Sequence, residues 1–246
     1  MFDVAHLVSM IPDILKAFKE TLIMISISTC VALIFGFPLG VLIFVTDKGM
    51  FWENRFIKNV FGFSVNFIRS IPYIILLVAL FPLTNLLVGS TIGPVAASVS
   101  LSIAAIPFFA RLVVTSLREI DPGIIEATTA VGATPWMIIK DVLFPEARSS
   151  IIQGITLTII SLIAYSAMAG VVGGGGIGDL AIRFGYYRYD DTIMISTVAI
   201  LVILVQLIQL GGDLIAKKLI NDRRLGYEKV IIFNSFCINN NRTSSL

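Results

Sequence analysis

The chain has 246 residues, of which 57% are hydrophobic and 14% are charged, and its mean hydropathy is +0.93. A water-soluble domain of this size cannot hide so many apolar side chains in its core, so the composition excludes a soluble protein and indicates an integral membrane protein. The formal net charge of +2 says little about partners, and nucleic acid is not expected among them.

Five apolar stretches are long enough to cross a bilayer, which takes about 20 helical residues each. They fall at about residues 20–45, 60–87, 92–117, 150–172 and 191–216. We therefore predict an all-α integral membrane protein with five transmembrane helices. Its transmembrane domain covers residues 20–217, between an external lead-in over residues 1–19 and a cytoplasmic tail over residues 218–246.

Lys and Arg are unevenly distributed among the connections between these stretches. Most lie after the first, third and fifth stretches: Lys48, Arg55, Lys58, Arg118, Lys140, Arg148, Lys217, Lys218, Arg223 and Arg224. The positive-inside rule makes these connections cytoplasmic. The N-terminus is therefore expected outside and the C-terminus in the cytoplasm.

The N-terminal lead-in precedes a first stretch that has no small-x-small cleavage site, so we expect a membrane anchor rather than a signal peptide. Pro12, Lys16 and Lys19 fit two descriptions of the lead-in. It is either an amphipathic segment in the outer interface or a frayed terminus.

The second stretch contains a cation, Arg69, followed by Ser70 and Pro72. A guanidinium inside a span is costly and usually faces the bundle interior or water. Two interpretations remain open. Arg69 lies about one helical turn above the cytoplasmic interface and extends its head group into water, or it is the counter-charge of a substrate carboxylate or an acidic gate residue.

Residues 121–147 form a polar segment between the third and fourth stretches. Asp121 and Thr134 are each an N-cap residue followed by a proline, and Gly132 suits the left-handed turn that ends a helix. The pattern predicts two short helices joined by a glycine bend.

The second short helix is expected to end at Pro145, because a proline disfavours α geometry in the preceding residue, Phe144. The segment carries too many apolar residues for a solvated loop. Helices of two or three turns are not stable alone, so these two require the bundle on one side and a partner on the other.

The same segment resembles the EAA loop of bacterial ABC-importer permeases, whose pattern is Glu-Ala-Ala, three residues, Gly, nine residues, Ile, any residue, Leu-Pro. The positions of that pattern are held here by Glu126, Ala127, Thr128, Gly132, Val142, Phe144 and Pro145. Thr128 departs from Ala, and Val142 and Phe144 are apolar replacements. The spacing is intact.

A resemblance to the methionine-importer permease subfamily extends over roughly residues 15–220, including FIRSIPYIILL at 67–77 and YSAMAG at 165–170. It fails beyond Leu225, so about the last 20 residues look like an added tail. The resemblance implies the fold of a type I importer permease, in which residues 121–147 are coupling helices held in a cleft on each ATPase subunit.

The resemblance also implies site residues. Coupling to the ATPase is expected at Glu126, Ala127, Thr128, Gly132, Ala133, Pro135 and Pro145. The substrate pathway or gate is expected at Tyr165, Ser166 and Met168, with Arg69 as a further candidate. Spacing alone leaves Met168 open between a deformable plug in the pathway and ordinary packing.

A run of glycines between Gly170 and Gly178 lacks the Gly-Lys-Ser/Thr ending of a phosphate loop. We expect it to be a flexible external turn. It leads to residues 183–191, RFGYYRYDD, whose aromatic and charged side chains suit the docking of a substrate-delivery protein.

No ATP-binding motif is present, and the single His6 and scattered carboxylates form no catalytic or metal site. We expect a transport subunit rather than an enzyme, with no cofactor of its own and with ATP and Mg²⁺ on a partner ATPase. The expected assembly is a homodimer with two ATPase subunits and one extracytoplasmic binding protein, in the bacterial inner membrane.

The resemblance implies D- and L-methionine and close analogues as substrates, and another amino acid or a small peptide is the alternative. A secondary transporter is a second class of hypothesis. It requires inverted repeats and acidic residues within the spans, and Asp and Glu are absent from the middle of every predicted span. A membrane-embedded enzyme ranks last, because the span-four Ser and Tyr have no His or Asp beside them.

Overall fold

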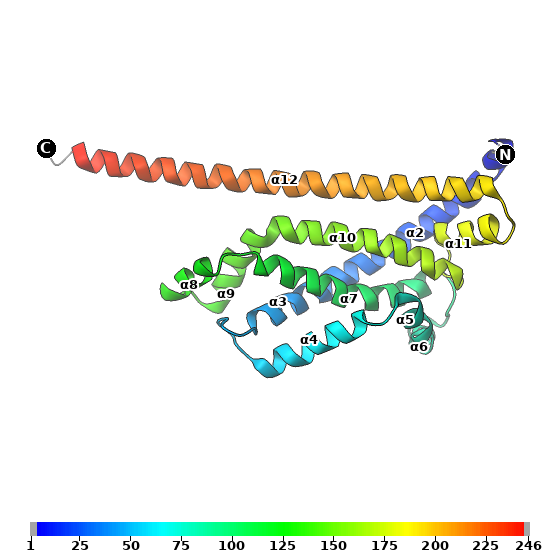
Figure 1. The fold of residues 1–246 in the computed structure, drawn as a ribbon, viewed down its shortest axis with the longest axis horizontal. Helices are drawn as coiled ribbons and strands as arrows, with labels where there is room; N and C mark the ends of the chain where they lie inside the picture. Colours follow the sequence, from blue (N-terminus) through cyan, green and yellow to red (C-terminus); the bar gives the residue numbers. More distant parts are fainter. Residues whose placement is uncertain (1–3, 244–246) are drawn as a thin grey trace.

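Helices make up the regular structure of the residues that the computed structural model describes, which are the backbone of residues 4–243 and the side chains of residues 6–220. Long helices run side by side, and shorter ones gather at the two ends (Figure 1). The α-helices and π-helical segments (η) are α1 (Val4–Ser9), α2 (Ile11–Val31), η1 (Ala32–Gly36), α3 (Phe37–Val45), α4 (Arg55–Arg69), α5 (Tyr73–Ala79), α6 (Phe81–Val88), α7 (Pro94–Arg118), α8 (Pro122–Ala130), α9 (Pro135–Met137), η2 (Ile138–Leu143), α10 (Phe144–Val171), α11 (Gly176–Leu180), η3 (Ala181–Tyr186) and α12 (Asp191–Thr243).

The all-α membrane prediction is confirmed in its coarse form. Within the described part of the chain, four helices are long and apolar enough to cross a membrane: Ile11–Val45, Pro94–Arg118, Pro135–Val171 and Asp191–Ile220. A bent pair, α4 with α5, makes a fifth if it counts as one span.

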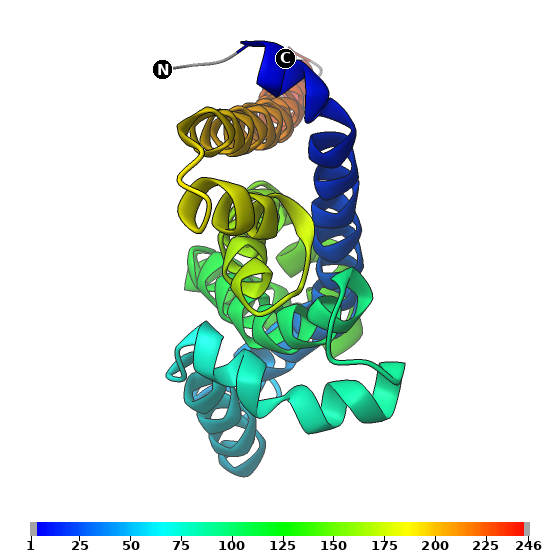
Figure 2. The same ribbon diagram turned by 90° about the vertical axis from the view of Figure 1, so that its right-hand side faces the viewer.

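Helix α7 forms the centre of the bundle and packs against α2, α3, α4 and α10. Seen along the bundle, α12 and α4 lie on opposite sides, with α7 and α10 between them (Figures 1 and 2). Small residues allow this close packing. A Cβ atom on Gly36 would lie 2.8 Å from the carbonyl oxygen of Ile106, and one on Gly40 would lie 2.7 Å from that of Ala110.

The first span begins earlier than predicted. Residues 11–19 belong to the continuous helix that runs to Val45, so the second half of the predicted lead-in is helical and joined directly to the first span. Pro12 fits the first turn of α2, where its missing N–H has no intrahelical partner to lose. Ala17 is buried in a cluster with Ile177 and Leu180 of α11, which gives this part of the helix a packing role.

The second predicted span is broken. Helices α4 and α5 are bent by 102° relative to one another, so one uninterrupted helix over residues 60–87 is wrong. Pro72 explains the break, because it cannot donate a backbone hydrogen bond and it disfavours helical geometry at Ile71. Pro82 lies in the first turn of α6, where a third short helix begins.

The predicted helix end at Pro145 is also wrong. Phe144 is helical, with φ −65° and ψ −49°, and its N–H donates to the carbonyl of Ile139, five residues back. The chain is therefore helical from Pro135 to Val171. The wider π turn of η2 changes the hydrogen-bond register just before the proline, which is how the helix accommodates it.

The glycine run is partly a turn and partly a helix. Residues 173–175 form the turn, but Gly176 and Gly178 belong to α11, so a flexible loop over the whole run is wrong. Glu20 and Thr21 of α2 accept hydrogen bonds of 2.9 Å from the N–H groups of Gly176 and Ile177. These contacts cap α11 and occupy the donors that a phosphate loop would present.

Helix α12 continues from the predicted fifth span through the predicted tail to Thr243. Its apolar length is mostly exposed, whereas most of α7 is buried. The side chains of the tail after Ile220, and residues 244–246, lie outside the described part of the chain.

Candidate functional site

A helical hairpin, α8 and α9, projects from one end of the bundle (Figure 1). Asp121 caps α8 by accepting a hydrogen bond of 2.8 Å from the N–H of Gly123. Thr134 caps α9 by accepting one of 3.4 Å from the N–H of Met137. Gly132 has a φ of +84°, the left-handed conformation that favours glycine. Both predicted caps and the glycine bend are confirmed.

The hairpin buries one apolar face and exposes another. Ile125 and Ile138 are buried in the main core of the bundle. On the other face, 82% of Val131 and 70% of Trp136 are exposed, and Met137 is half exposed. Exposed apolar groups this close together are typical of a protein interaction site. The prediction that one face meets the bundle is confirmed, and the other face is free to meet a partner.

The predicted coupling residues lie mostly on this hairpin. Glu126, Ala127 and Gly132 are exposed, and Ala133 and Pro135 are partly buried. Pro145 is exposed but lies on α10, at the base of the hairpin.

Thr128 stands where the EAA pattern has Ala. It is partly buried, and its hydroxyl donates to the carbonyls of Ile124 and Ile125. The Thr side chain is thus turned back onto its own helix and does not extend from the exposed face. This explains in physical terms how Thr can replace Ala here.

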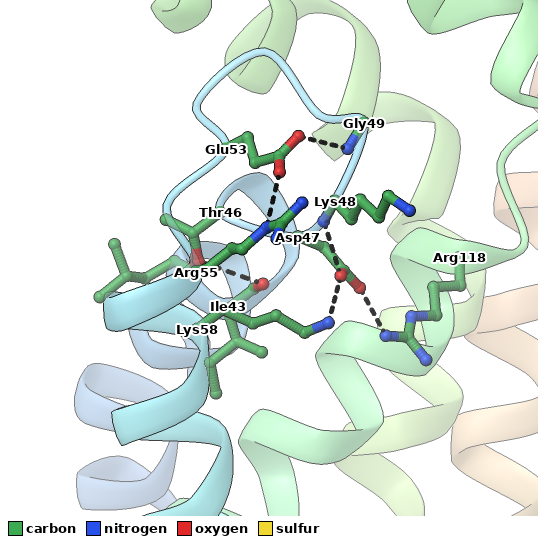
Figure 3. A network of polar contacts seen from close by, with 10 residues as sticks. Ile43, Thr46, Asp47, Lys48, Gly49, Glu53, Arg55, Lys58 and Arg118 are labelled. Atoms are coloured by element: carbon green, nitrogen blue, oxygen red, sulfur yellow. Dashed lines mark hydrogen bonds and ion pairs between the residues drawn. The ribbon is translucent and has the colours of Figure 1, made fainter.

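A carboxylate that the sequence analysis missed is bonded to Arg118, at the end of α7 that leads into the hairpin (Figure 3). Asp47 follows α3 and accepts hydrogen bonds of 2.7 Å from Nη2 of Arg118, 2.6 Å from Nζ of Lys58 and 2.8 Å from the N–H of Lys48. Its side chain is only 20% exposed. The positive-inside count used Lys58 and Arg118, but their common partner was not evident because it lies 71 residues from Arg118.

These contacts set the ionisation of Asp47. Burial opposes the charge, but the hydrogen bonds from Lys58, Lys48 and Arg118 outweigh burial and hold the pKa of the carboxyl below its ordinary 3.8. Asp47 is therefore a carboxylate at neutral pH and joins the end of α3, the first turn of α4 and the end of α7.

A cavity of about 410 Å³ lies behind the hairpin. Its lining comes from α7, α8, α10 and α12 and includes Ser116, Glu119, Asp121, Glu146, Gln153 and Ile220. Beside it, Arg148 and Ser149 donate to the carbonyls of Leu219 and Ala216, which ties α10 to α12. The cavity lies between α8 and α12, and α8 packs against η2 and, through Ile125, on the main core.

Three of the four predicted pathway residues share α10. Tyr165 stacks on Tyr73 of α5, whereas Ser166 is buried and donates to the carbonyl of Ile163 in its own helix. Met168 is 45% exposed, which argues against ordinary core packing. Among the described residues, no hydrogen bond, ion pair or ring contact joins the four pathway candidates to one another.

Arg69 is the last residue of α4 and is exposed. Its Cζ lies 5.8 Å from the ring centroid of Phe108 on α7. At about 1.5 Å per residue, Arg69 is about 21 Å along α4 from Arg55. Its exposed position at the end of α4 is compatible with both alternatives, a head group that reaches water and a counter-charge in the pathway.

The opposite end of the bundle carries an aromatic cluster, with Tyr186, Tyr187 and Tyr189 exposed. His6 and Asp190 lie 2.7 Å apart, so α1 is held against the turn before α12. This is the segment in which the sequence predicts docking of a delivery protein.

Comparison with known proteins places the chain in a family. Residues 32–224 match the family described as binding-protein-dependent transport system inner membrane component. The chain is 47% identical over 205 residues to the probable D-methionine transport system permease protein MetI of Vibrio cholerae, with 83% of this chain and 91% of that protein covered. It is 46% identical over 175 residues to the methionine import system permease protein MetP of Bacillus subtilis, with 71% and 78% covered.

A solved structure agrees with these relatives. A chain of the MetNI methionine ABC transporter, in an inward-facing conformation, matches with a TM-score of 0.84 and 43% identity, covering 86% of this chain and 98% of that chain. The resemblance noted in residues 121–147 therefore extends over 86% of this chain, and the chain belongs to the family of inner-membrane components of binding-protein-dependent transport systems.

Proposed function

We propose that this chain is the permease subunit of an ATP-driven importer that carries D- and L-methionine and close analogues across the bacterial inner membrane. The observation that carries the proposal is the capped hairpin α8–α9, which exposes Val131 and Trp136 at one end of a bundle belonging to this transport family. Two relatives and one solved structure with 43–47% identity bear methionine transport in their names, which supports the substrate.

In this proposal the exposed face of the hairpin binds an ATPase subunit, and the coupling residues are Glu126, Ala127, Thr128, Gly132, Ala133, Pro135 and Pro145. ATP and Mg²⁺ bind to the ATPase and not to this chain. The unbroken helix from Pro135 to Val171 supports a direct mechanical role, because a displacement of α9 moves α10. ATP drives transport only if it favours one conformation of the bundle over the other.

The broken pair α4–α5 counts as one span in this proposal, giving five spans with the N-terminus outside and the C-terminus in the cytoplasm. Two copies of the chain form the pathway, with two ATPase subunits on the hairpin side and a binding protein at the end carrying the exposed tyrosines. The exposed apolar length of α12 supports contact with lipid or with the second copy. Tyr165, Ser166, Met168 and Arg69 remain the proposed pathway residues.

The test is reconstitution of the chain with its ATPase and binding protein in proteoliposomes, followed by uptake of labelled methionine. ATP-dependent uptake of both enantiomers is expected. ATP-driven uptake of another amino acid or a peptide would reject the substrate only. Uptake that follows an ion gradient and ignores ATP would reject the importer in favour of a secondary transporter.

A further inference from the structure

The Asp47 cluster joins segments that are distant in sequence, the ends of α3 and α7 and the start of α4 (Figure 3). Arg118 is the last residue of α7, and only two residues separate it from Asp121, the cap of α8. One of these two, Ile120, is buried in the main core. The hydrogen bond from Arg118 to Asp47 therefore holds the point at which α7 leads into the hairpin.

The second ion pair of the cluster joins Asp47 to α4. Lys58 lies in the first turn of α4 and donates to the second oxygen of the Asp47 carboxylate. A small buried cluster continues this contact inward, since Val65 of α4 packs with Ile43 of α3 and Val114 of α7. Helix α4 then leads into the 102° bend before α5.

We infer that Asp47 is a positioning residue for energy coupling, which makes the ends of α3, α4 and α7 move as one unit with the hairpin. This inference rests on the proposed function. A displacement of α8 by the ATPase is passed by Arg118 and Asp47 to α4, and so to the bent segment α4–α5. Asp47 acts through its contacts with Arg118 and Lys58.

A second acidic residue in the same loop provides a matched comparison. Glu53 accepts hydrogen bonds from the N–H of Gly49 at 3.1 Å and from Nε of Arg55 at 3.4 Å, so its contacts stay within the loop and the first residue of α4. Its side chain is 38% exposed and that of Arg55 is 77% exposed. Glu53 therefore shares the charge and location of Asp47, but its carboxylate is not bonded to α7.

The experiment measures methionine uptake and ATP hydrolysis in the same proteoliposomes, using the full complex with ATPase and binding protein. For Asp47→Asn we expect uptake per ATP hydrolysed to fall by about fivefold or more, with the ATPase subunit still bound. Glu53→Gln should keep the wild-type ratio. A merely structural role would reduce uptake and hydrolysis in proportion, so an unchanged ratio in Asp47→Asn would overturn the inference.

Arg118→Gln provides a second test, because it removes the ion pair between Asp47 and α7 and leaves Asp47 paired with Lys58. If Asp47→Asn does not assemble, the ratio in Arg118→Gln decides: a reduced ratio supports the inference and a wild-type ratio rejects it. If the wild-type complex shows no ATP-driven methionine uptake, the proposed function is rejected, and the inference with it. Wild-type uptake with normal ratios in both variants would reject the inference alone.

Discussion

The rings of Tyr73 and Tyr165 stack with their centroids 4.8 Å apart and their planes inclined by 15°. Tyr73 belongs to α5, beyond the break in the second span, and Tyr165 belongs to α10, so the stack fastens the broken segment to the helix that continues from the hairpin. The hydroxyl of Tyr73 also lies 3.3 Å from Oγ of Ser100 on α7.

We predict that Tyr73→Leu and Tyr165→Leu are energetically coupled. Stacked aromatic pairs contribute about 0.5–1.5 kcal/mol beyond their buried area, so a double-mutant cycle on the free energy of unfolding should show a coupling of that size. Tyr73→Phe retains the ring and should keep the stack. If the loss of unfolding free energy in the double variant equals the sum of the losses in the two single Leu variants, the prediction is contradicted.

Substitution by alanine should have different effects on thermal stability at two adjacent glycines of α12, Gly211 and Gly212. A Cβ atom on Gly212 would collide with the side chain of Thr156 on α10, whereas a Cβ atom on Gly211 would meet open space. Overpacking costs about 1–3 kcal/mol, so Gly212→Ala should lower the Tm of the purified protein. Gly211→Ala should leave it unchanged or raise it slightly, since alanine favours helix. Equal Tm values for the two variants would show that α10 and α12 do not pack this closely.

Gly132→Asp should abolish transport while membrane insertion stays normal. An aspartate at a φ of +84° is strained, and it places a charge at the bend of the proposed ATPase contact. Gly89→Asp is the control, because Gly89 has a φ of +76°, also faces open space and ends α6. Retention of the ATPase on the purified chain is the measurement. Normal retention and uptake in Gly132→Asp would count against the coupling hairpin.

Trp136→Ala should weaken binding of the ATPase without lowering stability. The side chain is mostly exposed, so its loss leaves no cavity in this chain, and a buried Trp at an interface typically contributes about 2 kcal/mol or more. The expected effect is about a thirtyfold rise in Kd. Trp52→Ala removes the other tryptophan, also exposed, from the loop between α3 and α4, and should bind the ATPase normally. A comparable loss in both variants would shift the contact away from the hairpin.

The Asp47 carboxylate predicts a pH dependence of stability. The pKa of the Asp47 carboxyl in the folded state is below 3.8. The stabilisation of the folded state by the ionised carboxylate is therefore complete above that value and is lost as the pH falls through the lowered folded pKa. The Tm difference between wild type and Asp47→Asn should be constant from neutral pH to about pH 5 and should narrow below about pH 4. A difference that persists undiminished to about pH 3 would show that the charge is not what stabilises the site.

The features predicted correctly from sequence depend on neighbouring residues. Asp121 and Thr134 cap helices that begin at the next residue, and Gly132 closes a turn through its own φ. Local chemistry is enough for such features, which is why most of the hairpin was predictable. The family resemblance and the all-α membrane class are confirmed for the same reason, since composition and local motifs carry them.

The failures depend on partners far along the chain or on a backbone register that sequence does not show. Pro145 was expected to stop a helix, but the π turn of η2 absorbs it. Asp47 meets Arg118 across 71 residues, and no periodicity signals that contact. The roles assigned to the coupling and pathway residues stay predictions.

The contacts of Glu20 and Thr21 with α11 imply an order of assembly during biosynthesis. The acceptors lie 156 residues before the N–H groups that donate to them, so the first span is synthesised before α11 and its acceptors are already present when α11 forms. Backbone donors left unmatched in a membrane protein are costly. A chain expressed without its first span would contain every residue of α11 and still lack these acceptors.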